Sequence, residues 1–321
     1  MVEGSSSQQK STAFTIVVPC FNEEQQIATT IQNLERVTEG FNSVQIIIID
    51  DVSTDRTLDI ITDLANHDSK VDYLSFTHNF GKEAAMYAGL EVAVENESAV
   101  VFLDADGEHP PDLILELLEA SSEGFEHIVA RRERKIESGF LRKLIAGGSY
   151  RFLSRATGLS LTNGQGDFRL LSARLAANLK GFGERSRFSK GLYTFLGEPD
   201  LVIPFQVPDI VGLRKSRWNY RQLLSYSIDA LTGFNVRPLR KILSFGILTL
   251  VASIIYGITL VSLALTGSNT PPGYVTTSVT IVFFGSVNLV ALGVIGEYIG
   301  RILLESKQRP LYIVRKSSFE E

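Results

Sequence analysis

The chain contains a single cysteine, Cys20, among its 321 residues. One thiol cannot form an internal disulfide or a cysteine-rich zinc cluster, so neither paired-thiol redox chemistry nor a structural zinc site is expected. Hydrophobic residues make up 44% of the chain, which is too many for a disordered protein. At about 100–200 residues per domain, the length allows one large domain or two smaller ones.

Charge is missing from one long stretch. Residues 242–296 contain no Asp, Glu, Lys, Arg or His, although charged residues make up 21% of the whole chain. A turn-rich segment at 267–273 divides this stretch into two apolar runs, 242–266 and 275–299. Each run is long enough to cross a hydrocarbon core of about 30 Å as a helix, so the pattern predicts two transmembrane helices within 242–304. A pair of buried helices in a soluble protein is the alternative, but it needs a surrounding domain that the sequence does not provide.

The remaining charges are unevenly distributed. Residues 1–211 carry 19 Lys and Arg against 31 Asp and Glu, whereas residues 212–316 carry 12 against 3. The basic residues of the second part lie before the first apolar run and after the second, and none lies between the runs, which predicts that both termini are cytoplasmic. Residues 1–12 are polar and lack the apolar run of a signal peptide, so we expect a disordered N-terminus on a cytoplasmic domain at the cell membrane.

A basic juxtamembrane region, 212–241, precedes the first apolar run. Within it, residues 218–234 place apolar side chains at helical spacing, flanked by aromatic and basic residues. This pattern predicts an amphipathic helix that lies on an anionic membrane surface. The alternative is an ordinary amphipathic helix that closes the soluble domain.

The front of the chain, residues 13–211, alternates short apolar runs with segments of helix length. Strands are expected at 15–18, 44–49, 71–76 and 99–103, and helices at 24–37, 55–66, 82–95 and 111–122. Continuously apolar strands such as 46–49 are typical of a parallel sheet covered on both faces. The sequence therefore predicts a Rossmann-like α/β domain with its ligand site at the carboxyl ends of the strands.

Acidic residues follow the predicted strands, while the glycine-rich fingerprints of dinucleotide and P-loop proteins are missing. Asp104, Asp106 and Glu108 offer hard oxygen ligands that suit Mg²⁺ or Mn²⁺ bridging two phosphates. The alternative is that these carboxylates cap the next helix. Asp50 and Asp51 have the same two interpretations, as caps of helix 55–66 or as acceptors for a ribose or a base edge.

Six segments together give a specific resemblance. They are 17–24 (VVPCFNEE), 48–57 (IIDDVSTDRT), 78–85 (HNFGKEAA), 103–112 (LDADGEHPPD), 166–171 (GDFRLL) and 187–192 (RFSKGL). In this order, and followed by two terminal spans, they resemble the inverting family 2 glycosyltransferases of the GT-A fold. The whole chain is similar to polyisoprenyl-phosphate glycosyltransferases, the group of dolichol-phosphate mannose synthase and the bactoprenol glucosyl transferases.

The resemblance implies inverting transfer of a hexose from a nucleotide sugar to undecaprenyl or another polyprenyl phosphate. UDP-glucose is the favoured donor, while GDP-mannose, a UDP-aminopentose donor and a catalytically inactive nucleotide-sugar-binding scaffold remain open. A homo-oligomer, with a tetramer favoured, is expected, and no nucleic-acid partner. The predicted site residues are Pro19, Asn22, Glu23, Asp50, Asp51, Lys82 and Asp104 for the nucleotide sugar, Asp106, Asp167 and Arg169 for catalysis, Arg131, Arg187 and Lys190 for the acceptor phosphate, and Asp104, Asp106 and Glu108 for the metal.

Two further expectations concern Asp167 and the tail. A lipid phosphate has a second pKa of about 6 and is mostly deprotonated near neutral pH, so it needs no general base. We therefore expect Asp167 to orient the donor sugar instead of removing a proton. Residues 310–315, in the cytoplasmic tail 305–321, read as a strand with an unpaired edge, which predicts pairing with another chain.

Overall fold

The structure is a computed structural model, and it describes residues 13–41, 43–133, 165–185, 187–206 and 273–319, with a few residues between 248 and 262. The chain divides into two compact units. An α/β unit holds the described residues up to 206 together with the tail from Arg309, and a second unit holds the long helix α10 (Tyr274–Ser306). The predicted N-terminal tail 1–12 and the predicted helix 218–234 lie outside the described residues.

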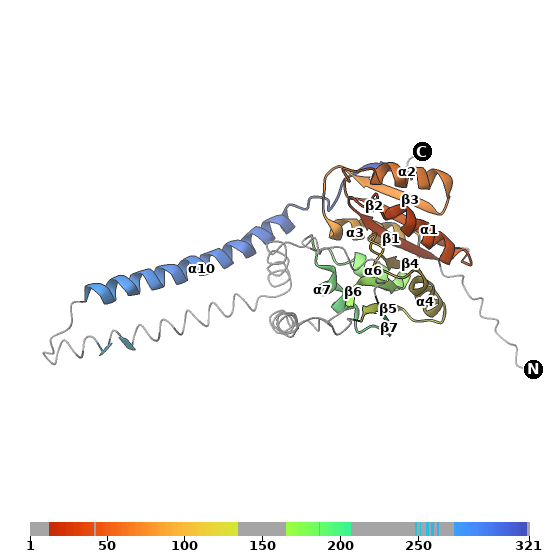
Figure 1. Cartoon of the computed structure of the whole chain (residues 1–321). Helices are drawn as coiled ribbons and strands as arrows, with labels where there is room; N and C mark the ends of the chain where they lie inside the picture. Colours follow the sequence, from red (N-terminus) through yellow and green to blue (C-terminus); the bar gives the residue numbers. More distant parts are fainter. Residues whose placement is uncertain are drawn as a thin grey trace, which may run out of the picture. The chain divides into compact units, whose positions relative to one another are not determined.

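One mixed sheet forms the centre of the α/β unit (Figure 1). Its strands follow the order β7-β5-β6-β4-β1-β2-β3-β8, in which β6 and β8 run antiparallel to their neighbours and the others run parallel. The mostly parallel sheet predicted from the sequence is thereby confirmed. The strand bounds are β1 (Phe14–Cys20), β2 (Val44–Asp50), β3 (Val71–Phe76), β4 (Ala99–Phe102), β5 (His127–Arg132), β6 (Gln165–Leu171), β7 (Leu201–Phe205) and β8 (Val314–Ser317).

Helices cover both faces of this sheet. On one face, Ile31 of α1, Ile61 of α2 and Leu117 of α4 share one apolar cluster with alternate residues of the strands, and α1 packs beside α4 (Figure 1). On the other face, α3 packs on β1, and α6 packs beside α3. The helix bounds are α1 (Ile27–Thr38), α2 (Thr57–His67), α3 (Lys82–Glu95), α4 (Pro111–Ser122), α6 (Ala173–Lys180) and α7 (Ser189–Leu192), with a 3₁₀ helix η1 (Tyr193–Leu196).

The packing agrees with the apolar pattern of the strands. Ile46 to Ile49 of β2 are fully buried, as expected for a strand covered on both faces. Helix α3 approaches β1 closely at Gly89, where an added Cβ would lie 2.2 Å from a methyl carbon of Val17. A side chain at this position would collide with Val17. Glycine therefore allows α3, which carries site residues at its first turn, to pack closely against the sheet.

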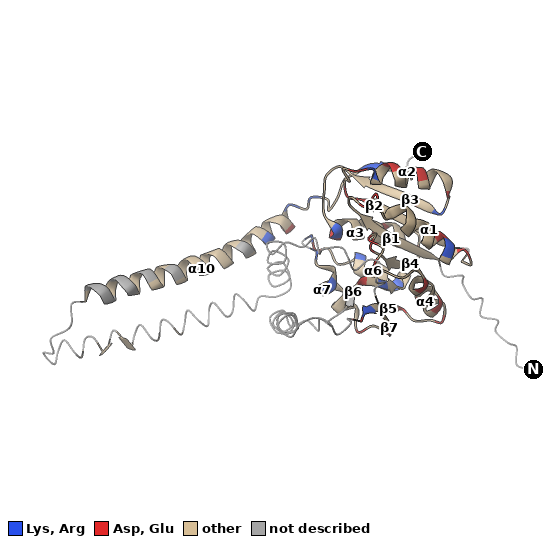
Figure 2. Cartoon of the chain, in the orientation of Figure 1, with Lys and Arg blue, Asp and Glu red and all other residues tan. Residues whose placement is uncertain are grey.

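Helix α10 is 33 residues long, and its segment Phe283–Ser306 is apolar enough to cross a membrane. Figure 2 shows charge colours on α10 only towards its C-terminal end. The predicted second span, 275–299, falls within this helix. Of the predicted first span, 242–266, the structure describes only scattered residues, including Leu248 and Val251, and these are helical.

The C-terminal tail returns to the α/β unit. Its strand is β8 (Val314–Ser317), which pairs antiparallel with β3 of the same chain. The predicted strand at 310–315 was therefore placed too early, and one of its edges pairs with β3 of the same chain. Because β8 is the last strand of the sheet, pairing of its other edge with another chain stays a prediction. Tyr312 reinforces the contact, since its ring stacks on Phe76 at 5.0 Å and its hydroxyl donates to Glu91 at 2.6 Å.

Candidate functional site

The sheet topology brings the predicted acidic residues to one edge. Asp104 follows the carboxyl end of β4, and the antiparallel β6, which pairs with β4, begins at this edge with Asp167 near its start. Lys82, the first residue of α3, joins the two carboxylates. Its Nζ lies 2.6 Å from Oδ1 of Asp104 and 2.7 Å from Oδ2 of Asp167. Three predicted site residues from distant parts of the chain are thus in direct contact.

Lys82 and Asp167 fix each other's charge. Burial disfavours the ammonium of Lys82, but Asp167 and Asp104 outweigh this cost and raise the pKa of Lys82. Burial also disfavours the carboxylate of Asp167, but Lys82, Lys190 and Arg169 outweigh it, so the pKa of Asp167 falls to about 2. Both groups are therefore ionised near neutral pH.

The predicted metal ligands Asp104, Asp106 and Glu108 form a candidate cation site, which we call the seat. Asp106 Oδ1 accepts the backbone N–H of Glu108 at 3.0 Å, and the carboxylate of Glu108 pairs with Arg132 at 2.8 Å. Among the described residues, no three His, Cys, Asp or Glu side chains gather as a metal cage. Magnesium often binds through one or two carboxylates and the phosphates of a substrate, keeping several waters. Asp104 and Asp106 fit that mode, whereas Glu108, predicted as a third ligand, is held by Arg132.

Two loops beside this seat are tied together. Asn22, after β1, has a positive φ of 57°, and its Oδ1 accepts the backbone N–H of Thr54, after β2, at 2.7 Å. The N–H of Glu23 donates to Oγ1 of Thr57 at 2.9 Å. Asn22, Glu23 and the half-buried Pro19 therefore form one rim beside the seat, where the predicted nucleoside contact stays a prediction.

The two aspartates at the carboxyl end of β2 hold the protein's own loops. Asp50 is fully buried and accepts hydrogen bonds from the N–H of Ser53 and the hydroxyl of Ser75, and its predicted contact with the nucleotide stays a prediction. Asp51 is 4% exposed, and its two oxygens accept the N–H groups of Phe80 at 2.7 Å and Gly81 at 2.9 Å. Asp51 thus fixes the loop that leads into α3 and Lys82.

Arg169 lies beneath the edge of the sheet and is only 4% exposed. Its guanidinium sits 3.4 Å from the ring centre of Tyr193, and Nη2 donates to the carbonyl of Gly166 at 2.8 Å. The predicted contact of Arg169 with the sugar or the reacting phosphate stays a prediction. Within the structure, its charge helps to lower the pKa of the Asp167 carboxyl.

The three predicted acceptor residues have different surroundings. Arg187 donates to the carbonyl of Phe182 at 2.9 Å, and its guanidinium lies 4.4 Å from the ring centre of Tyr87. It therefore connects the residues after α6 with α3. Lys190, in α7, lies close enough to Asp167 to lower its pKa. Arg131 is exposed near the end of β5, opposite Gln165 of β6. Among the described residues, Lys190 and Arg131 make no such contacts to backbone or ring and are the stronger candidates for an acceptor phosphate, while the predicted role of Arg187 stays a prediction.

Glu83 belongs to the site, although sequence reasoning gave it no role. Its carboxylate accepts the backbone N–H of Ser189 at 3.1 Å and also the Ser189 hydroxyl. Burial, with a smaller effect from Asp167, raises the pKa of Glu83. The segments 78–85 and 187–192 both looked distinctive in the sequence, but nothing there indicated that Glu83 joins them.

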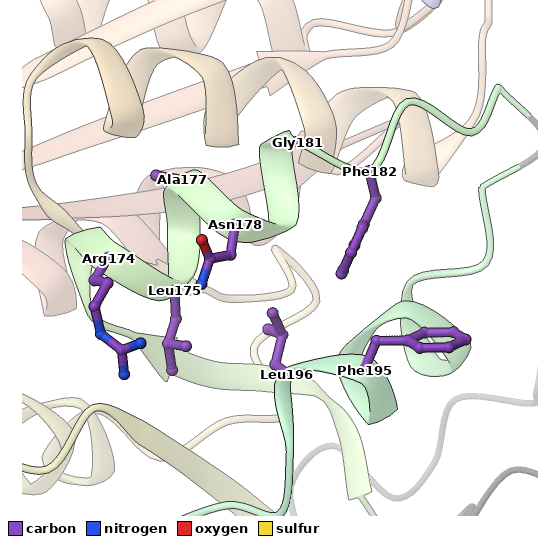
Figure 3. Close-up of a pocket in the computed structure, with 8 residues that line it drawn as sticks. All are labelled: Arg174, Leu175, Ala177, Asn178, Gly181, Phe182, Phe195 and Leu196. Atoms are coloured by element: carbon purple, nitrogen blue, oxygen red, sulfur yellow. The ribbon is translucent and has the colours of Figure 1, made fainter.

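A groove elsewhere on the α/β unit has a volume of about 520 Å³. Figure 3 shows that side chains of α6 and η1 face it. The lining residues are Arg174, Leu175, Ala177, Asn178, Gly181, Phe182, Phe195 and Leu196. None of the predicted site residues lines this groove, so the groove is separate from the candidate cation site and from Asp167.

Comparison with known proteins gives two family matches. Residues 15–179 match the model of glycosyl transferase family 2, and residues 237–302 match that of the GtrB C-terminal hairpin. The putative glycosyltransferase CsbB of Bacillus subtilis is 38% identical over 313 residues, which cover 96% of this chain and 93% of that protein. The bactoprenol glucosyl transferase of Shigella phage SfII is 35% identical over 305 residues, covering 94% of this chain and 97% of that one.

A solved structure is similar at a lower level. Glucosyl-3-phosphoglycerate synthase from Mycobacterium tuberculosis, in complex with Mn²⁺, UDP and glucosyl-3-phosphoglycerate, gives a TM-score of 0.45 at 19% identity. The match covers 69% of this chain and 78% of that one. A similarity of this size assigns no activity to the present chain.

Proposed function

The chain belongs to glycosyl transferase family 2, and from this premise we propose that it transfers glucose from UDP-glucose to the phosphate of a polyprenyl phosphate. The transfer inverts the anomeric carbon, and undecaprenyl phosphate is the favoured acceptor. The name of the phage relative supports both the glucosyl group and the bactoprenol lipid, because the similarity runs through both units of the chain.

The contact of Asp104, Lys82 and Asp167 is the observation that carries the proposal. It places two carboxylates and a cation at the edge of a mostly parallel sheet, which is where α/β proteins bind their ligands. A diphosphate needs cations, and a sugar needs hydrogen-bond acceptors. This edge offers both within one cluster.

On the donor side, Pro19, Asn22 and Glu23 border the nucleoside. Asp104 and Asp106 would hold the divalent cation, Mg²⁺ or Mn²⁺, which when bound neutralises the diphosphate and the charge that develops on the leaving UDP. Lys82 adds a second positive charge beside the same phosphates. The protein's own contribution is to hold these charges in place before the donor arrives.

On the acceptor side, Lys190 and Arg131 stabilise the lipid phosphate. One of its oxygens attacks the anomeric carbon of glucose, the bond from that carbon to the diphosphate breaks, and UDP leaves with the bonding electrons. Asp167 accepts hydrogen bonds from the sugar hydroxyls and orients the ring. With a pKa of about 2, this carboxylate is a weak base near neutral pH, which supports an orienting role.

The second unit anchors the enzyme to the membrane where its lipid substrate lies. The apolar segment of α10 and the match to the C-terminal hairpin support two membrane spans. The distribution of Lys and Arg supports cytoplasmic termini, a cytoplasmic catalytic domain at 13–211 and a basic juxtamembrane contact with anionic lipids. A homo-oligomer, with a tetramer favoured, remains part of the proposal.

The proposal is tested with the purified full-length protein in detergent. It is incubated with polyprenyl phosphate, Mg²⁺ and one radiolabelled donor at a time: UDP-glucose, UDP-galactose or GDP-mannose. We expect radiolabel in the lipid extract with UDP-glucose. Label from another donor would change the sugar, and no label from any donor would indicate an inactive nucleotide-sugar-binding scaffold.

A further inference from the structure

We propose that Lys82 is a built-in counter-ion of the donor site, which releases Asp104 when a divalent cation binds together with the donor diphosphate. The inference rests on the proposed function, because it assumes that Asp104 is a metal ligand. It assigns Lys82 two positions in the reaction cycle, first on Asp104 and then on the diphosphate.

The geometry carries the first position. Nζ of Lys82 lies 2.6 Å from Asp104 Oδ1 and donates a hydrogen bond to the oxygen that a metal ion would need as a ligand. A carboxylate oxygen held by an ammonium at this distance is less available to a cation. In the structure, Asp104 is therefore already paired with a tethered positive charge.

The second contact of Lys82 makes an exchange possible. Its Nζ also lies 2.7 Å from Asp167 Oδ2, so loss of Asp104 does not leave the ammonium unpaired. The side chains of Lys82 and Asp104 are 43% and 35% exposed, so solvent and a ligand can reach the pair. Lys82 begins α3, and its flexible stem can move the ammonium without moving the helix.

Binding order follows from the balance of charge. A divalent cation alone would have to displace an ammonium and leave it beside the new positive charge, which is unfavourable. A diphosphate supplies negative charge that can take the ammonium over. We therefore expect the free enzyme to bind metal weakly and the nucleotide diphosphate to strengthen metal binding.

The test measures Mn²⁺ binding to the full-length protein in detergent by electron paramagnetic resonance, without donor or acceptor. Replacing Lys82→Met should increase Mn²⁺ affinity by about tenfold, since the competing charge is gone. Lys82→Arg keeps the cation and should stay near wild type. Lys180→Met removes a lysine at the end of α6 that pairs with Glu95 of α3, and it controls for the loss of one positive charge.

UDP is then added to each protein. It should increase Mn²⁺ affinity strongly in wild type and much less in Lys82→Met, because the ammonium that exchanges is missing. Mn²⁺ affinity in Lys82→Met equal to that of wild type or of Lys180→Met would overturn the inference. Since no transfer is measured, a failure of the proposed reaction would appear in the product assay and not here; a melting temperature near wild type verifies the fold of each variant.

Discussion

At the scale of single residues, Asp167 has two different oxygens. Oδ2 is held by Lys82, while the buried Oδ1 has no hydrogen-bond partner among the described residues. A buried acceptor without a partner is costly, and a donor sugar hydroxyl can relieve that cost. This oxygen supports the proposed role of Asp167, which is to orient a sugar while neighbouring charges keep the carboxylate ionised.

Asp167→Asn tests whether this residue orients the sugar or removes a proton. If it orients the sugar, turnover should fall by about a hundredfold, and by nearly the same factor from pH 7 to pH 9, because no proton transfer limits the rate. The measurement is the ratio of wild-type to variant turnover across that range. A residual rate that climbs steeply with pH, with unchanged donor binding, would restore the role of general base.

His127 makes the stability depend on pH. Burial, helped by the charge of Arg169, lowers the pKa of His127 to about 4, against about 6.5 in the unfolded chain. Between these values the unfolded state binds the proton and the folded state does not. The free energy of unfolding therefore decreases as the pH falls from about 6.5 to about 4.

We expect the melting temperature of the full chain in detergent to fall between pH 7 and pH 5, by an amount corresponding to roughly 1 kcal/mol. His127→Gln should reduce this fall, and only partly, since burial also lowers the pKa of His109. His67→Gln, which replaces an exposed histidine at the end of α2, is the matched control. Equal pH dependence in all three proteins would contradict the assignment.

At the scale of elements, α3 connects the parts of the site. Its first residue, Lys82, contacts Asp104 after β4 and Asp167 in β6. Its second residue, Glu83, binds the start of α7, and Glu91 further along accepts a hydrogen bond from Tyr312 of the tail. Lys190 lies in α7, directly after the Ser189 that Glu83 binds. The position of this acceptor candidate therefore depends on α3.

Glu83→Ala should raise the KM for polyprenyl phosphate by about tenfold while the KM for UDP-glucose changes by less than about threefold, because Lys190 loses its support and the donor side does not. Glu83→Gln keeps one acceptor oxygen and should recover most of the loss. Glu95→Ala, at the other end of α3, serves as the control. Equal changes in both KM values would indicate a general structural defect and contradict the assignment.

The sequence predicted most of these elements. Strands β1 to β4 and helices α1 to α4 lie within a few residues of their predicted bounds, since their apolar periodicity is strong. The residues of β6 are recognisable in the sequence as a motif, but the position of β6 beside β4 depends on long-range pairing that periodicity does not encode. For the same reason the tail was identified as a strand while its partner β3, far away in the chain, was missed.

The candidate site was predicted with similar limits. Asp104, Lys82 and Asp167 were identified and do come together. Asp50 and Arg169 were predicted as ligand contacts, and both side chains are buried. Their partners Ser75 and Tyr193 lie about 25 residues further along the chain, so the sequence alone does not show this packing. Residue type and order indicate which side chains matter, whereas burial depends on packing that only the fold supplies.

At the scale of the whole molecule, the chain leaves the α/β unit, forms the unit with α10, and returns to end in β8. The tail after α10 is held by the sheet and by the contact of Tyr312 with Glu91. The unit with the membrane-spanning candidate is thus connected to the α/β unit on both sides in sequence. The proposed transfer needs a soluble donor and a membrane-bound acceptor to meet, and the chain links the second unit to the α/β unit at both of its ends.

The proposed function requires that glucose, and not glucose phosphate, moves from the donor to the lipid phosphate. The most direct measurement is chromatography of the nucleotide released from UDP-glucose by the full-length protein, with and without polyprenyl phosphate. We expect UDP, released only when the lipid is present and lost in Asp104→Asn. Release of UMP would indicate transfer of a sugar phosphate, and UDP release that does not depend on the lipid would contradict the assigned acceptor.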